Sequence, residues 1–82
     1  MNANEDYIYH HRYLNNVLKS LIKSTKFNHD KREIYTPFSE DVTIPSYTSF
    51  KKYCERVFGL SHSENVNVWY EYLEYIHSEI HK

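Results

Sequence analysis

The sequence predicts an all-α fold, a small three-helix domain with a long extended or hairpin-like connector between the first and second helices. Two observations support this fold class. Three segments, 5–26, 47–58 and 62–80, repeat apolar residues every three or four positions, which is the spacing of helices with one buried side. The chain has 82 residues, enough for one hydrophobic core, so 1–82 is expected to form a single domain.

The first helix is expected over residues 5–26. Asn4 is a suitable N-cap, and the carboxylates of Glu5 and Asp6 favour the positive end of the helix dipole. The apolar stripe, broadened by Val17 and Ile22, comprises Tyr7, His11, Leu14, Leu18, Leu21 and Thr25. A basic face on the opposite side comprises Arg12, Lys19, Lys23 and Lys26. This face is a candidate contact with an acidic partner or an anionic membrane surface, and ordinary solvated surface is the alternative.

The connector, residues 28–46, contains two short stretches with the composition of strands. Residues 34–36 and 42–44 are rich in β-branched side chains and are separated by residues 37–41. An isolated pair of strands is stable only when it packs on something else. Two arrangements therefore remain open: the stretches pair as a small hairpin, or they run as an extended loop over the helices.

The second helix is expected over residues 47–58, and both of its ends are marked. Pro45 and Ser46 form a start signal in which Ser46 is the N-cap. Gly59, the only glycine, follows the helix at the position where a left-handed residue commonly ends it. The apolar face of this helix comprises Tyr47, Phe50, Cys54 and Val57.

The third helix is expected over residues 62–80, after a capping box formed by Ser61 and Glu64. Its core seam is expected at Val66, Trp69, Leu73, Ile76 and Ile80. The helix is also apolar and aromatic beside that seam, and nine tyrosines are more than a small core can bury with satisfied hydroxyls. With packing at the core edge as the alternative, the predicted partner-binding residues are Val68, Tyr70, Tyr72 and Tyr75.

The residues that enzymes and metal sites require are largely missing from the sequence. The single cysteine, Cys54, lies on an apolar face and excludes internal disulfides and multi-cysteine zinc sites. A single glycine leaves no phosphate-binding loop. His77 and His81 have the spacing of two metal ligands, but zinc needs at least three. We therefore expect a non-enzymatic protein with no catalytic residue, no cofactor and no bound metal.

Charge is divided along the chain, although its net value is only −1. Residues 1–32 contain six basic and three acidic residues, whereas residues 33–82 contain four basic and eight acidic residues.

Residues 54–69 resemble the turn of a helix-turn-helix, which makes a small nucleic-acid-binding regulator the alternative function. No Lys or Arg lies between Arg56 and Lys82, so this region would repel phosphate. Nucleic acid is therefore the less favoured partner.

The expected compartment is the cytoplasm. Charged residues and histidines interrupt residues 5–12, so the N-terminal stretch lacks the apolar core of a secretory signal. No segment approaches the roughly 18 consecutive apolar residues that a membrane-spanning helix needs, and no membrane insertion is expected. The lone cysteine fits a reducing compartment.

The composition has the bias of an AT-rich genome, because Asn, Lys, Tyr and Ile together supply 29 of the 82 residues. In length and overall character the chain resembles the lysis-inhibition accessory proteins of T4-like bacteriophages. That resemblance implies a cytoplasmic antiholin, which binds the cytosolic part of the phage holin and delays hole formation. The sequence thus favours a small regulatory protein that binds another protein, with self-association as a further arrangement of its aromatic face.

Overall fold

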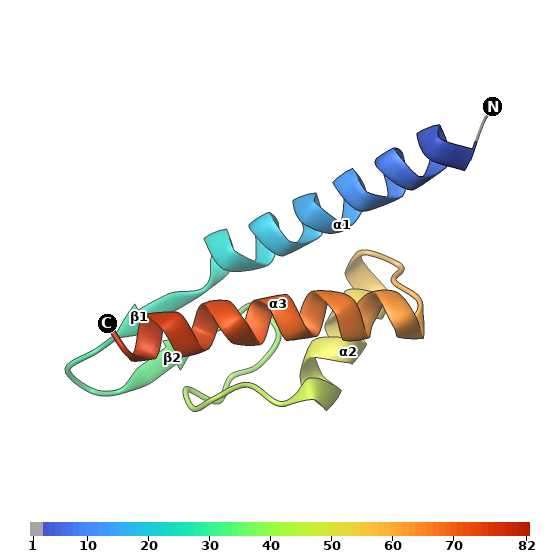
Figure 1. The fold of residues 1–82 in the computed structure, drawn as a ribbon. Coiled ribbons are helices and arrows are strands. Elements are labelled where there is room, and N and C mark those ends of the chain that lie inside the picture. Colours follow the sequence, from blue (N-terminus) through green and yellow to red (C-terminus); the bar gives the residue numbers. More distant parts are fainter. Residues whose placement is uncertain (1–2) are drawn as a thin grey trace.

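The computed structural model describes residues 3–82 and the side chains of residues 11–82. Most of the chain belongs to three helices, α1 (Ala3–Ser24), α2 (Tyr47–Val57) and α3 (His62–Ile80) (Figure 1). Between α1 and α2 in the chain, a two-stranded antiparallel sheet is formed by β1 (Lys26–Asn28) and β2 (Glu33–Tyr35). The three predicted helices are confirmed, and the fold is mostly helical rather than strictly all-α.

Both ends of α1 differ from the prediction. The helix starts before Asn4, which is therefore not its N-cap. It ends at Ser24 because Thr25 turns the chain, and the Thr25 hydroxyl donates a hydrogen bond to the carbonyl of Leu21 at 2.7 Å. Lys26, predicted as the last helical residue, belongs to β1 instead.

The buried side of α1 is centred on Val17 and Leu21, whereas His11 from the predicted stripe is exposed. The Tyr13 hydroxyl donates a hydrogen bond to the carbonyl of Phe58 at the end of α2, and α1 packs on α3. Four residues of the prediction have side chains outside the described range: Asn4, Glu5, Asp6 and Tyr7.

The connector forms its hairpin earlier in the chain than predicted. The register of β1 and β2 is Lys26↔Tyr35, Phe27↔Ile34 and Asn28↔Glu33. In the turn, Asn28 Oδ1 accepts the Lys31 N–H at 3.2 Å, and Arg32 has a φ of 55°. Residues 42–44 are not a strand, yet the Ile34 N–H donates to the carbonyl of Val42 at 2.8 Å. The connector therefore combines a hairpin with an extended loop beside it.

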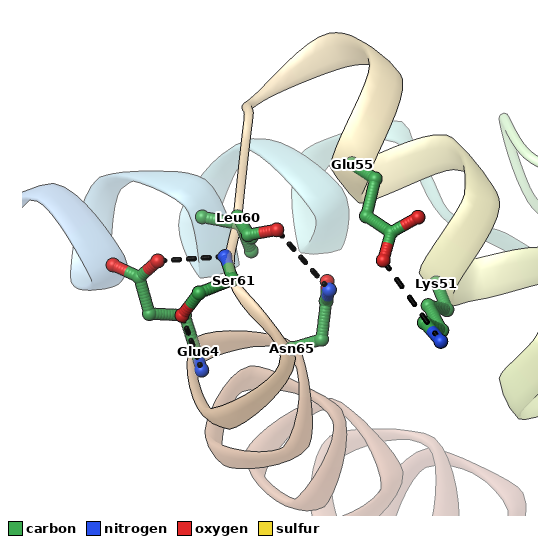
Figure 2. Close-up of polar contacts among 6 residues, drawn as sticks. All are labelled: Lys51, Glu55, Leu60, Ser61, Glu64 and Asn65. Atoms are coloured by element: carbon green, nitrogen blue, oxygen red, sulfur yellow. Dashed lines mark hydrogen bonds and ion pairs between the residues drawn. The ribbon is translucent and has the colours of Figure 1, made fainter.

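The predicted caps of α2 and α3 are confirmed, and Figure 2 shows the capping box of α3. Ser46 caps α2 by accepting the Ser49 N–H at 3.3 Å. Gly59 has a φ of 65°, in the left-handed region that ends many helices. The capping box of α3 is complete, since the Glu64 carboxylate accepts the Ser61 N–H (2.7 Å) and the Ser61 hydroxyl accepts the Glu64 N–H (3.4 Å).

Two residues near this turn do not have the burial that the sequence predicts. Val57, assigned to the apolar face of α2, is half-exposed, whereas Phe50 and Cys54 are fully buried. Asn65 is also fully buried, and its Nδ2 donates to the carbonyl of Leu60 at 3.4 Å (Figure 2). A polar side chain thus occupies a core position at the start of α3, because it ties the turn to the helix.

Aromatic rings from α2, α3 and the connector form the centre of the core. Phe50 and Tyr72 are fully buried, with ring centroids 5.7 Å apart. Phe38, in the connector, packs edge-on against both rings, at 5.6 and 5.8 Å. Trp69 contacts Phe50 at 4.9 Å. Both α1 and α2 pack on α3, which makes α3 the central element of the fold (Figure 1).

Candidate protein-binding surface

The four predicted partner-binding residues on α3 divide between core and surface. Val68 (2% exposed) and Tyr72 (0%) lie in the core, so the prediction that they belong to an exposed docking face is wrong. Tyr75 is half-buried and sets its ring edge-on to Phe27 of β1, with centroids 5.9 Å apart. Tyr70 is 65% exposed. Of the four residues, Tyr70 is the one that a partner can reach freely.

Val68 and Tyr72 are buried because α3 is rotated about its own axis relative to the orientation that the sequence predicts. The buried line along the helix comprises Asn65, Val68, Tyr72 and Ile76. Ile80, predicted as a core residue, is 41% exposed. Tyr72 and Tyr75 contact the segment from Thr25 to Phe27, which follows α1. Phe50 of α2 contacts both Trp69 and Tyr72. The sequence showed two apolar sides of this helix, but not which of them the neighbouring elements cover.

The Tyr72 hydroxyl belongs to a chain of hydrogen bonds inside the core. The Thr25 hydroxyl donates its only proton to the Leu21 carbonyl. The hydrogen bond between the Tyr72 and Thr25 hydroxyls, 2.7 Å long, must therefore be donated by Tyr72. Burial raises the pKa of Tyr72 to about 12, because a buried phenolate loses its hydration. Tyr72 is thus a structural residue that links α3 to the end of α1.

A different set of apolar side chains, exposed except for the half-buried Leu73, lies along one flank of α3. We name it the α3 flank patch, and it consists of Ile44, Tyr70, Leu73 and Ile80. Ile44, near the end of the connector, is 64% exposed. These residues line a shallow hollow of about 490 Å³, and most of the surface exposed in it is apolar. Single exposed apolar residues are ordinary, but a contiguous group around a hollow is typical of a binding surface.

The sequence predicts one part of the α3 flank patch, Tyr70, but gives no sign of another, Ile44. Tyr70 was identified because it lies beside the apolar seam of a helix that is aromatic on more than one side. Ile44 was assigned to a candidate strand, and only folding brings it beside Leu73 and Ile80. No local pattern in the connector distinguishes Ile44 from residues that pack inward.

Polar groups accompany the α3 flank patch. Glu74 and His77 line the same hollow between the apolar side chains. Beyond it, Lys82 Nζ lies 2.7 Å from Glu79 Oε1, and this hydrogen bond raises the pKa of Lys82. The carboxylate of Glu74 favours a partner that offers apolar side chains with a basic residue at their edge.

The predicted basic face is exposed throughout: Arg12, Lys19, Lys23 and Lys26. Three of these residues lie on α1, and Lys26 lies in β1 opposite Tyr35. The basic face and the α3 flank patch therefore belong to different elements, so a partner can meet one without displacing the other.

Residues with metal-binding or nucleophilic chemistry do not gather into a site in the described part of the chain. Within residues 11–82, no group of three or more His, Cys, Asp and Glu side chains is arranged to hold a metal ion. The rings of His77 and His81 lie 4.2 Å apart, and His81 Nδ1 is 2.8 Å from the His77 carbonyl oxygen. Burial raises the pKa of the Cys54 thiol to about 12, which keeps it protonated and a poor nucleophile.

The surface of α3 is unfavourable for the nucleic-acid alternative. Glu71 and Glu74 are exposed on it, and α3 contains no Lys or Arg. Carboxylates on a recognition helix repel the phosphate backbone that supplies most nonspecific affinity.

None of the helices within the described residues is long and apolar enough to cross a membrane. Comparisons with known protein families, with curated proteins and with solved structures find no match to the chain. The function must therefore be argued from the chain's own residues and surfaces.

Proposed function

We propose that the chain is a small non-enzymatic regulatory protein that binds another protein through the α3 flank patch. The observation that carries this proposal is the 65% exposure of Tyr70 beside the exposed side chains of Ile44 and Ile80. A tyrosine offers a large contact area with few rotamers to order, and tyrosines accordingly recur among the residues that dominate binding energy. Covering the patch with a partner removes this apolar surface from water.

The first partner to test is the cytosolic part of a phage holin, which the resemblance to lysis-inhibition accessory proteins implies. Such a partner places the chain in the cytoplasm, close to the inner surface of the membrane. Each basic side chain near an anionic membrane contributes about 1 kcal/mol, so the basic face on α1 and β1 supports this location. These charges mainly accelerate encounter, while the α3 flank patch supplies affinity.

The test compares substitutions of two exposed apolar residues. Tyr70→Ser removes the largest side chain of the α3 flank patch, whereas Val57→Ser removes a half-exposed side chain on α2 and is the matched control. Binding to a soluble fragment carrying the cytosolic part of the holin is measured by calorimetry. We expect Tyr70→Ser to weaken binding by about 2 kcal/mol, roughly thirtyfold, and Val57→Ser to leave it unchanged.

Both variants should keep the fold, since each side chain is at least half-exposed and neither belongs to the core, and circular dichroism checks this. Wild-type affinity in the Tyr70→Ser variant would exclude the α3 flank patch as the binding surface. Equal weakening by both substitutions would show that the measured binding is not specific to this patch.

A further inference from the structure

A second hollow, of about 580 Å³, lies between α2 and the turn that follows β2. It shares no residue with the α3 flank patch. Basic, hydroxyl-bearing and aromatic side chains form its walls, including Ser39, Ser49, Lys52, Tyr53 and Arg56. This combination contrasts with the largely apolar walls at the α3 flank patch, so the two hollows suit ligands of different chemistry.

Two cationic side chains of α2 border this second hollow. Lys52 and Arg56 are four residues apart, so they lie on the same face of the helix, and both are exposed. Neither forms an ion pair with a residue in the range 11–82, whereas the neighbouring Lys51 lies 4.0 Å from Glu55 (Figure 2). Like charges at this spacing repel each other. An anion bound between Lys52 and Arg56 would be attracted by both.

Hydroxyl groups in the walls add hydrogen-bond donors. The Ser46 hydroxyl donates to Ser49 Oγ (3.1 Å), and the Asp41 N–H donates to Ser39 Oγ (3.1 Å). Both serine oxygens thus accept a hydrogen bond already, and their own protons remain to be donated. The buried hydroxyl oxygen of Thr36, in the same wall, has no hydrogen-bond partner among the described residues. The Ser39 and Ser49 hydroxyls can therefore donate to a ligand in the hollow, whereas the Thr36 oxygen is itself buried.

The turn over residues 36–40, which forms one wall, is fixed by the core. Phe38 packs its ring against Phe50 and Tyr72, with centroids 5.6 and 5.8 Å away. Thr36 and Ser39 are joined by a single antiparallel bridge across the turn. Because this wall is anchored before a ligand arrives, little conformational entropy is lost on binding.

We propose that this hollow binds the phosphate group of a small phosphorylated molecule between Lys52 and Arg56. The Arg56 guanidinium presents a planar fork of N–H donors that matches phosphate oxygens, and Lys52 adds a compact positive charge. Phe38 and Tyr53 give the remainder of the ligand an aromatic wall. Glu40 also lines the hollow, and its carboxylate opposes an anion.

The test titrates the isotope-labelled chain with adenosine monophosphate, inorganic phosphate and adenosine in separate NMR experiments. We expect the two phosphate-containing probes to shift signals mainly in residues 36–40 and 49–56. Lys52→Gln and Arg56→Gln should each weaken adenosine monophosphate binding about fivefold or more, because each removes a charge-assisted contact. Glu40→Gln should strengthen binding about twofold by removing an opposing charge. Lys51→Gln, the matched control, should leave affinity unchanged, because Lys51 is directed to Glu55.

The probes also distinguish the source of the phosphate. Adenosine monophosphate that binds more tightly than inorganic phosphate assigns the site to a nucleotide-like ligand, and equal affinities assign it to the phosphate group alone. Either result supports the proposal. It is overturned if localised shifts are absent at about 10 mM phosphate or adenosine monophosphate, if adenosine binds as tightly as its monophosphate, or if Lys51→Gln weakens binding as much as Arg56→Gln.

Discussion

Tyr70 and Tyr72 lie two positions apart on α3 but in opposite environments. The ring of Tyr72 fills the centre of the core, and its hydroxyl donates to Thr25, whereas Tyr70 is 65% exposed. Residues two apart on a helix point in nearly opposite directions, so one short segment can serve both the core and a binding surface. The tyrosine content of the chain therefore does not measure the size of its binding surface.

Tyr72→Phe keeps the buried ring and removes the hydrogen bond to Thr25. The Thr25 hydroxyl still donates to Leu21, so no buried donor is left without a partner. We expect the free energy of unfolding to fall by about 1 kcal/mol. Tyr72→Ser removes the ring as well and should lower the free energy of unfolding by about 3–5 kcal/mol, which is enough to unfold a marginally stable domain. Urea denaturation measures both values, and equal losses in the two variants would contradict a core position for the ring.

The difference in stability between the wild type and Tyr72→Phe depends on pH, because folding raises the pKa of Tyr72 in the wild type. Because this pKa rises from 10.0 to about 12 on folding, the contribution of Tyr72 to stability is complete below pH 10 and is lost as pH rises towards 12. Folding also raises the pKa of Cys54 from 9.0, so the wild type and Tyr72→Phe both lose further stability as the pH rises above about 9. The stability gap between wild type and Tyr72→Phe should therefore narrow from pH 8 to pH 11. A gap that stays constant over this range would contradict the burial of the Tyr72 hydroxyl.

At the scale of elements, the end of α2 depends on the backbone conformation of Gly59. Its φ of 65° is unfavourable for residues with a Cβ, yet a Cβ added there meets no atom within 4 Å. Gly59→Ala should therefore lower the free energy of unfolding by about 1–2 kcal/mol through backbone strain alone. Gly59→Asn should lower it less, since asparagine adopts this conformation more readily. Equal losses by urea denaturation would show that steric contact, not backbone conformation, selects glycine here.

The basic face of α1 is expected to accelerate encounter with the partner. Lys19→Glu combined with Lys23→Glu should slow association with the holin fragment about tenfold at low salt, and the difference should vanish as salt rises. The control combines Lys31→Glu with Lys52→Glu, which changes net charge equally outside the basic face. Stopped-flow kinetics measure both rates. If the control slows association as much as the test variant, net charge rather than the basic face steers the partner.

Local signals predicted the boundaries of α2 and α3, whereas packing between elements decided the rest. Ser46, Ser61 and Glu64 act on backbone groups within three residues, so their caps could be identified from the sequence. The predicted hairpin lay too late in the chain because Lys26–Asn28 resembles a helix end, and its pairing depends on residues five to nine positions later. The rotation of α3 depends on α1 and α2, which cover two of its sides.

For the whole molecule, the candidate surface joins segments that are distant in the chain. Ile44 lies in the connector, whereas Tyr70 and Ile80 lie on α3, and only the folded arrangement places them around one hollow. The sequence therefore predicted an aromatic binding surface on the third helix but included two core residues, Val68 and Tyr72, within it. A binding surface and a core face have the same composition, and burial alone separates them.

The central claim is that affinity for the partner comes from apolar contact rather than from phosphate attraction. The measurement that tests it most directly is the dissociation constant for the holin fragment at 50 and 200 mM salt, beside the same titration with duplex DNA. We expect the dissociation constant for the holin fragment to change by less than about tenfold, because apolar contacts are only weakly affected by salt, and we expect DNA to bind weakly. DNA binding that is tighter than holin binding and falls by about a thousandfold over this range would contradict the claim and establish a nucleic-acid-binding regulator.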